Sequence, residues 1–320
     1  SCRSAFARSG PSGDDAAVGK RTTTITVGEV QISLSSEDRV LFPEDDITKG
    51  DLIEYYRAVA AVMVPHVARR PLTLHRFPSG IDGQKFYQKQ AADYFPGWIQ
   101  RVTLRSADGD DKEYVTADDA ASIVYLANQN CIVFHPCSTK APELHRPDLL
   151  ILDLDPSDND FEKVREGAQR LRGILSEVGL VPFLKTTGSR GLHVVAPIVP
   201  EEDEDGVRQF ARLIADVLVR EAPDVFTVEM SKVARGRRVF VDHLRNGKAQ
   251  TAVAPYSVRA LPGAPVAMPI RWAELDDPAL DARRYRLRDA PAVLEERGDV
   301  WRDIRLSARP LGPARARLAL

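Results

Sequence analysis

The chain has 320 residues, of which 43% are hydrophobic and 28% charged, and its formal net charge is −2. No apolar run reaches the roughly 18 residues of a membrane span, and no apolar segment near the start resembles a secretory signal. Three cysteines do not make a disulfide framework. We therefore expect a soluble cytoplasmic protein from a reducing compartment, with a core large enough for one big domain or two packed ones.

The first predicted elements are a disordered leader over residues 1–21 and a β-branched strand over 22–27. Apolar residues then recur at helical spacing from about residue 49 to 68, with Thr48 as a plausible N-cap. Lys49 stands at the N-terminus of this helix, and Arg39 precedes it. Both are either ordinary surface cations or ligands of a phosphate group.

Paired aromatics follow a predicted strand over residues 72–76. Phe86 and Tyr87 are adjacent, so in a strand only one of them faces the core, and the other is free to stack on a nucleic-acid base. A hairpin is expected over residues 102–116, and then a helix capped by Asp118.

Four soft metal ligands lie within 15 residues: Cys131, His135, Cys137 and His145. They raise the hypothesis of a structural zinc site. Their spacing is not that of a standard zinc finger, and Cys131 and His135 would share one face of an apolar strand.

The most informative stretch is the apolar run 149–152, which predicts a buried strand followed by Asp153 and Asp155. Two residues apart on a strand, both carboxylates leave the same face. Carboxylates held that close repel each other unless a cation lies between them, and Mg²⁺ or Mn²⁺ suits oxygen ligands. The alternative is a strand that ends in a polar turn before a helix over residues 161–178.

Further along, residues 187–191 form a Gly/Ser/Thr turn that would present N–H groups, hydroxyls and a cation to an anion. The strand predicted over 239–242 ends in a third carboxylate, Asp242. Six cations between Lys232 and Lys248 predict a cationic groove despite the neutral total. Carboxylates that hold metal ions, next to cations that grip phosphates, are what two-metal phosphoryl transfer requires.

Several of these motifs together resemble the polymerase domain of bacterial ligase D, a member of the archaeo-eukaryotic primase superfamily that serves non-homologous end joining. The resemblance is carried by residues 152–156, 187–193, 240–246 and 254–259, and it extends in the same order from about Asp38 to Leu275. It implies an α/β primase-polymerase fold with a central mixed, RNA-recognition-like sheet, a second β-rich layer and flanking helices.

The resemblance also implies one domain over residues 22–305, followed by a tail over 306–320. Its parts would be a 5′-phosphate- and template-binding part (22–130), a catalytic core (131–275) and a helical C-terminal part (276–305). The implied roles are two Mn²⁺ or Mg²⁺ ions on Asp153, Asp155 and Asp242; nucleotide binding by His135, Thr187, Ser189, Arg190, His193, Arg235 and Arg259; and DNA binding by Arg39, Lys49, Phe86 and Tyr87.

The sequence departs from the family pattern at four places. Arg39 stands where lysine is frequent, Thr187 where serine is frequent, Cys137 where tryptophan is usual, and His243 where an aromatic is common. The first two replacements keep the implied chemistry, and the last two affect local packing and nucleotide preference.

The function that the resemblance implies is a metal-dependent nucleotidyltransferase that extends primer 3′-OH ends and fills short gaps at DNA breaks, preferring ribonucleoside triphosphates. Its partners would be DNA ends and gaps with a 5′-phosphate, with Ku and a DNA ligase, in the nucleoid-associated cytoplasm of a bacterium. No ligase or nuclease motif is apparent, so we expect an excised domain or a stand-alone relative.

Two alternatives remain. A haloacid-dehalogenase-like phosphatase also places Asp-x-Asp after an apolar strand, and Asp299 and Asp303 mimic its later acidic motif, but this reading leaves Asp242 unexplained. A non-catalytic nucleic-acid-binding module with an RNA-recognition-like fold must treat three carboxylates as accidental, although they would repel DNA unless filled by metal.

Overall fold

The computed structural model describes residues 23–105 and 109–318, so the leader expected over 1–21 lies outside the described residues. Its central element is a mixed six-stranded sheet, in which only the pair at one edge is parallel. From one edge to the other, the strands are β13 (Phe226–Thr227), β14 (Val239–Asp242), β10 (Leu149–Pro156), β12 (Leu192–Pro197), β11 (Phe183–Thr186) and β15 (Pro269–Ile270). The α/β class predicted from the sequence is therefore confirmed.

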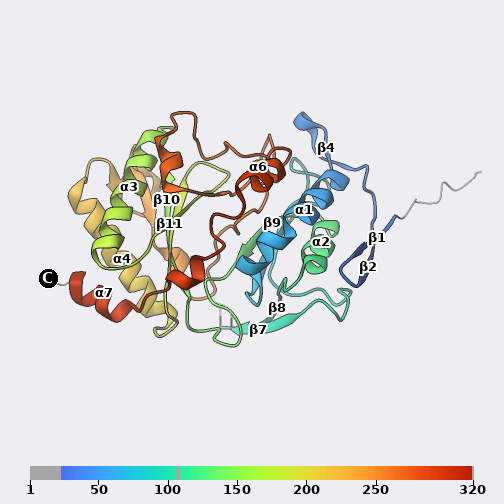
Figure 1. The fold of residues 1–320 in the computed structure, drawn as a ribbon, viewed down its shortest axis with the longest axis horizontal. Helices are drawn as coiled ribbons and strands as arrows, with labels where there is room; N and C mark the ends of the chain where they lie inside the picture. The colour runs from blue at the N-terminus through green and yellow to red at the C-terminus, as the bar shows by residue number, and fades with distance from the viewer. Residues whose placement is uncertain (1–22, 106–108, 319–320) are drawn as a thin grey trace, which may run out of the picture.

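Two amphipathic helices pack against this sheet, α3 (Phe161–Glu177) and α4 (Glu204–Glu221). Their apolar residues recur at helical spacing and are buried, while Asp160 and Asp203 cap their first turns. Asp160, five residues after Asp155, is thus the residue that begins the helix expected over 161–178. In Figure 1 both helices lie side by side in the left half of the molecule.

The C-terminal residues 306–320, expected to form a tail, instead contain the helix α7 (Leu311–Leu318). Leu311 and Ala314 are buried, and Arg315 pairs with Glu202 at 2.6 Å. Figure 1 shows α7 beside α4. The short apolar stripe of this helix is stabilised by a distant partner rather than by its own length.

The N-terminal part forms the right half of Figure 1. A three-stranded sheet of β6 (Phe86–Gln88), β5 (Leu72–Arg76) and β9 (Cys131–Pro136) packs with α1 (Lys49–Val67) and α2 (Ala120–Asn128). Three strand pairs complete it: β1 (Thr24–Val27) with β2 (Val30–Ser33), β3 (Val40–Phe42) with β4 (Ile47–Thr48), and β7 (Arg101–Arg105) with β8 (Asp111–Val115). No helix among the described residues is long and apolar enough to cross a membrane.

The caps of the two N-terminal helices test the sequence analysis closely. Thr48 caps α1 as predicted, and Asp51 returns the bond to complete a capping box. The cap of α2 is Asp119, which accepts the backbone N–H of Ser122 at 2.7 Å, so the assignment to Asp118 was wrong by one residue. Asp118 instead accepts the backbone N–H of Arg69.

One hydrophobic cluster runs through both halves, and buried tyrosines join them. The hydroxyl of Tyr55 on α1 donates to the Tyr256 carbonyl at 2.7 Å, and the hydroxyl of Tyr56 accepts the backbone N–H of Val258 at 3.0 Å. The remaining short helices are η1 (Pro43–Asp45), α5 (Lys232–Arg235), η2 (Leu244–Asn246), η3 (Trp272–Asp276), α6 (Ala290–Arg297) and η4 (Ile304–Ser307). The contact between the two halves places the six-stranded sheet opposite β6 and β9, and residues of both line a common cavity.

Candidate active site

The strand register brings the predicted carboxylates together. Asp153 on β10 lies directly opposite His193 on β12 and, on its other side, opposite Asp242 on β14. Directly opposite residues in antiparallel strands point to the same face, and Asp155 follows two residues along on that face. The sequence placed the aspartates after the strand, but β10 continues to Pro156, so hydrogen-bonded neighbours on both sides hold them in place.

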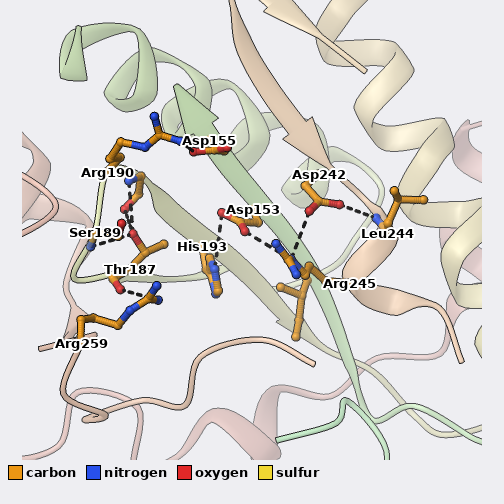
Figure 2. A network of polar contacts seen from close by, with 12 residues as sticks. Asp153, Asp155, Thr187, Ser189, Arg190, His193, Asp242, Leu244, Arg245 and Arg259 are labelled. Atoms are coloured by element: carbon orange, nitrogen blue, oxygen red, sulfur yellow. Dashed lines mark hydrogen bonds and ion pairs between the residues drawn. The ribbon is translucent and has the colours of Figure 1, made fainter. Parts of the chain in front are cut away.

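Arginines supply the positive charge that these carboxylates need (Figure 2). Arg245 bridges two strands, with its Nε 3.4 Å from Asp153 and 3.1 Å from Asp242. Asp155 is held by Arg190 at 3.0 Å and by Arg235 at 3.7 Å. The negative charge of the site is thus balanced by side chains that come from three separate segments.

The pKa values of the paired aspartates Asp153 and Asp242 are shifted in opposite directions. Burial by itself would raise the pKa of Asp153, but His193, Arg245 and Lys185 outweigh it and hold this pKa well below the usual range. Burial raises the pKa of Asp242 above its usual range, although Arg245 opposes the shift. Burial also lowers the pKa of His193 to about 4, so its imidazole is neutral at pH 7.

Metal binding by the aspartates remains a prediction. Within residues 23–105 and 109–318, no three His, Cys, Asp or Glu side chains form a ready metal cage. The donor set nevertheless fits Mn²⁺ or Mg²⁺, because three carboxylates stand on neighbouring strands with guanidinium groups as their counter-ions. A bound ion would take over the charge balance that Arg245 now provides.

The zinc hypothesis receives no support from the described residues. Cys131 is buried and its thiol donates to the Val133 carbonyl, and burial raises the pKa of Cys137 to about 12. His145 points to Glu204 at 3.8 Å, with its side chain 66% exposed.

The Thr187–Gly191 turn is built by its own hydrogen bonds. The Thr187 hydroxyl donates to the Gly191 carbonyl at 2.9 Å and accepts the backbone N–H groups of Ser189 and Gly191. Gly188 has a φ of +64°, which glycine adopts without strain. The hydroxyl of Thr187 therefore stabilises the turn through its hydrogen bonds, and a nucleotide-binding role for it remains a prediction.

Most of the predicted residues line one cavity of about 230 Å³. From the six-stranded sheet and its turn come Asp153, Asp155, Thr187, Ser189, Arg190 and His193; from the opposite side come Tyr87, His135 and Arg259; and Arg245 also lines it. Arg259 donates to the Thr187 carbonyl at 3.2 Å (Figure 2). Burial, and to a smaller extent the charge of Arg259, lowers the pKa of His135 well below its usual range. The cavity thus combines carboxylates, arginines and an aromatic ring.

Both predicted aromatics are exposed, so the expectation that one of them faces the core was wrong, because β6 lies at the edge of its sheet. Tyr87 is 62% exposed, stacks on His75 with ring centres 4.0 Å apart, and reaches the cavity. Phe86 lies under the guanidinium of Arg76 and does not line the cavity. Of the pair, Tyr87 is the one that lines the cavity, and base stacking by its ring remains a prediction.

The two predicted phosphate ligands, Arg39 and Lys49, differ in their exposure to solvent. Arg39 is exposed and donates to the Pro78 carbonyl at 2.6 Å. Lys49 is only 1% exposed, and its ammonium donates to the carbonyl and the hydroxyl of Ser35. Burial, followed by Arg39, lowers the pKa of Lys49 to about 8. Lys49 is therefore not an ordinary surface cation, because its ammonium turns inward to Ser35, and its phosphate role remains a prediction.

Two residues of the site were missed by the sequence analysis. Arg245 was counted only as groove charge, although its place three residues after Asp242, on a helical turn, was a local signal that both side chains share a face. Lys185 lies next to His193 across β11 and β12, and no local pattern shows that pairing. Asp299, the later acid of the phosphatase alternative, pairs with His66 at 3.1 Å and does not line the cavity.

Comparisons with known proteins agree with this geometry. A family model described as "LigD, primase-polymerase domain" matches residues 48–301. The non-homologous end joining DNA repair protein LigD of Mycobacterium tuberculosis is 35% identical over 81% of this chain, and LigD of Pseudomonas aeruginosa is 33% identical over 85%. The chain spans 35% and 32% of the length of these two relatives.

A solved structure shows the same architecture. The polymerase domain of Mycobacterium tuberculosis ligase D, in complex with DNA, superposes with a TM-score of 0.82 at 33% identity. The match covers 87% of this chain and 99% of that one, which confirms the primase-polymerase fold expected from the motifs and excludes the phosphatase alternative. The chain therefore belongs to the LigD primase-polymerase domain family, a family of nucleotidyltransferases.

Proposed function

We propose that this chain extends the 3′-OH of a DNA primer with nucleoside triphosphates and fills short gaps at DNA breaks during non-homologous end joining. The observation that carries the proposal is the row of His193, Asp153 and Asp242 across three strands, of which His193 and Asp153 line a cavity that arginines also line. The similarity to LigD proteins and to a DNA-bound polymerase domain supports the same assignment.

Asp153, Asp155 and Asp242 are the residues that would hold two divalent ions, Mn²⁺ or Mg²⁺. Such ions make the primer hydroxyl a stronger nucleophile and neutralise charge on the leaving pyrophosphate. Three carboxylates without cations would instead repel both DNA and nucleotide, so their concentration here favours catalysis over a purely binding role.

The cationic side of the cavity would bind the triphosphate. Arg190 stands on the turn and is 48% exposed at its side chain, so it can leave Asp155 for a phosphate oxygen once a metal ion takes over that carboxylate. Arg259 is held at the opposite wall by the Thr187 carbonyl. His135 is kept neutral by burial and contributes a hydrogen-bonding ring rather than a charge.

The DNA-facing side chains lie toward the N-terminal part. Tyr87 presents its exposed ring at the cavity, where stacking on a template base would contribute about 1–3 kcal/mol. Arg39 offers an exposed guanidinium for a 5′-phosphate beyond a gap. A preference for ribonucleotides and a partnership with Ku and a DNA ligase follow from the family resemblance and belong to this proposal.

The test is primer extension on a one-nucleotide DNA gap with a 5′-phosphate, in Mn²⁺, with ribo- or deoxyribonucleoside triphosphates supplied separately. Wild type should add one nucleotide, with more product from the ribonucleotide. Asp153→Asn should remove extension while gap binding, followed by fluorescence anisotropy, stays near wild type.

The matched control is Asp216→Asn, an exposed aspartate on α4 that pairs with Arg212 and should change neither measurement. Gap binding without extension in any divalent metal would replace the proposal with the non-catalytic binding module. Extension by Asp153→Asn at the wild-type rate would refute the role given to that carboxylate.

A further inference from the structure

Lys185 extends the row of site residues by one strand. It lies directly opposite His193 in the β11–β12 pair, and His193 in turn lies opposite Asp153. Directly opposite residues share a face of the sheet, so Lys185, His193, Asp153 and Asp242 form one line across four neighbouring strands. The lysine stands behind the histidine as seen from the aspartates.

Both Lys185 and His193 carry a buried nitrogen without a partner. The two residues are 2% and 3% exposed, and neither the Lys185 Nζ nor the His193 Nδ1 has a hydrogen-bond partner among the described residues. Buried polar groups are normally paired, and an unpaired ammonium is costly. Because the two residues lie opposite each other on neighbouring strands, their unpaired atoms call for a common explanation.

A second, smaller cavity joins them. It measures about 40 Å³, and both Lys185 and His193 line it together with apolar groups such as Trp301 and Ile151. One water needs roughly 10–15 Å³ and several polar partners. The cavity that both residues line is therefore large enough to hold a water.

The hydrogen-bond roles at His193 follow from its neighbours. Its Nε2 lies 3.5 Å from the Asp153 carboxylate, which as an anion can only accept. A neutral imidazole has one N–H, so the hydrogen belongs on Nε2 and leaves Nδ1 as an acceptor. The Lys185 Nζ carries N–H donors whether or not it is protonated, so Lys185 is a complementary neighbour for Nδ1.

We propose that Lys185 is a positioning residue: through one water in the small cavity, it donates to the Nδ1 of His193 and thereby fixes the imidazole tautomer whose Nε2–H points at Asp153. The same arrangement of carboxyl, imidazole and a further polar partner orients histidines in many sites. The tautomer itself depends only on these contacts, whereas its benefit to nucleotide addition rests on the function proposed above.

Lys185 has no acidic partner within hydrogen-bond distance, and burial lowers its pKa to about 7. Replacing it by methionine, which is close in shape and apolar, should therefore stabilise the fold while releasing His193. A lysine kept only for structure would give the opposite result, because its removal would then lower stability.

The experiment measures ¹⁵N chemical shifts of the histidine rings in protein free of DNA and nucleotide, with His193→Gln to assign the signal. Wild type should show a protonated Nε2 and an unprotonated Nδ1. In Lys185→Met the two shifts should converge as tautomers mix, the melting temperature should rise by about 2–4 °C, and kcat for extension should fall about tenfold with KM for DNA unchanged.

Lys185→Gln, whose amide can still donate, should keep the wild-type tautomer, and the exposed surface variant Arg220→Met at the end of α4 should change nothing. An unchanged His193 tautomer in Lys185→Met, or a variant that is less stable or unfolded, would overturn the inference. The ring shifts are read without activity, so a wild-type protein that shows the tautomer but no extension would count against the proposed function alone.

Discussion

Replacing Gly191 by alanine should damage the fold and the site together. A Cβ built at this position would lie 1.8 Å from the carbonyl oxygen of Leu154 and 2.9 Å from its carbonyl carbon. Both atoms belong to the backbone of β10, so no side-chain rotation can relieve the overlap. Leu154 stands between Asp153 and Asp155, and any shift of its peptide moves the two carboxylates.

The cost can be bounded from these contacts. Overpacking that forces a backbone shift costs about 1–3 kcal/mol. A weakened hydrogen bond between β12 and β10 adds about 1 kcal/mol. Alanine recovers about 0.5–1 kcal/mol, because it loses less conformational freedom on folding than glycine does. We expect Gly191→Ala to lower the free energy of unfolding by about 1–3 kcal/mol.

The assay is chemical denaturation followed by circular dichroism, alongside gap extension. The matched control is Gly173→Ala on α3, where an added Cβ would meet nothing within 4 Å. In a helix interior that change should stabilise the protein by about 0.5–1 kcal/mol. If Gly191→Ala unfolded at the wild-type midpoint and retained extension, the close approach of the turn to β10 would be refuted.

Three further predictions concern charged residues. Arg245→Gln leaves Asp153 and Asp242 without their shared cation. The metal-free variant should therefore lose about 1 kcal/mol of stability, and added Mn²⁺ should reduce this loss in a thermal-shift assay. A loss that Mn²⁺ leaves unchanged would contradict the prediction. Folding lowers the pKa of Lys49 to about 8, which disfavours its charged form, so the free energy of unfolding should rise between about pH 8 and pH 10. Urea titrations over this pH range should show a smaller rise for Lys49→Met than for the wild type. An equal rise in both proteins would count against the buried ammonium. Arg39→Ala should weaken binding to gaps with a 5′-phosphate and reduce the salt slope by about one, whereas an equal loss on unphosphorylated gaps would remove the phosphate role.

Local patterns in the sequence determined the elements whose signals are short-range. The apolar stripe and Thr48 predicted α1 to within a residue, because helical spacing and capping depend only on neighbours three and four positions away. The side of the sheet shared by Asp153 and Asp155 was equally predictable, because alternation along a strand has a period of two. The motifs that resemble the LigD polymerase domain supplied the family, which the comparisons confirmed.

Only the tertiary structure decided which strands become neighbours. The line from Lys185 through His193 and Asp153 to Asp242 depends on the order and register of four strands. Neither the order nor the register can be deduced from the amino-acid sequence of one chain. The same limit explains why the burial of Lys49 had no local signal: its ammonium donates to Ser35, which lies in the loop after β2, 14 positions earlier in the chain. Spacing along the chain sets which way a side chain points, whereas long-range packing sets what it meets, and the chemistry of this site requires both.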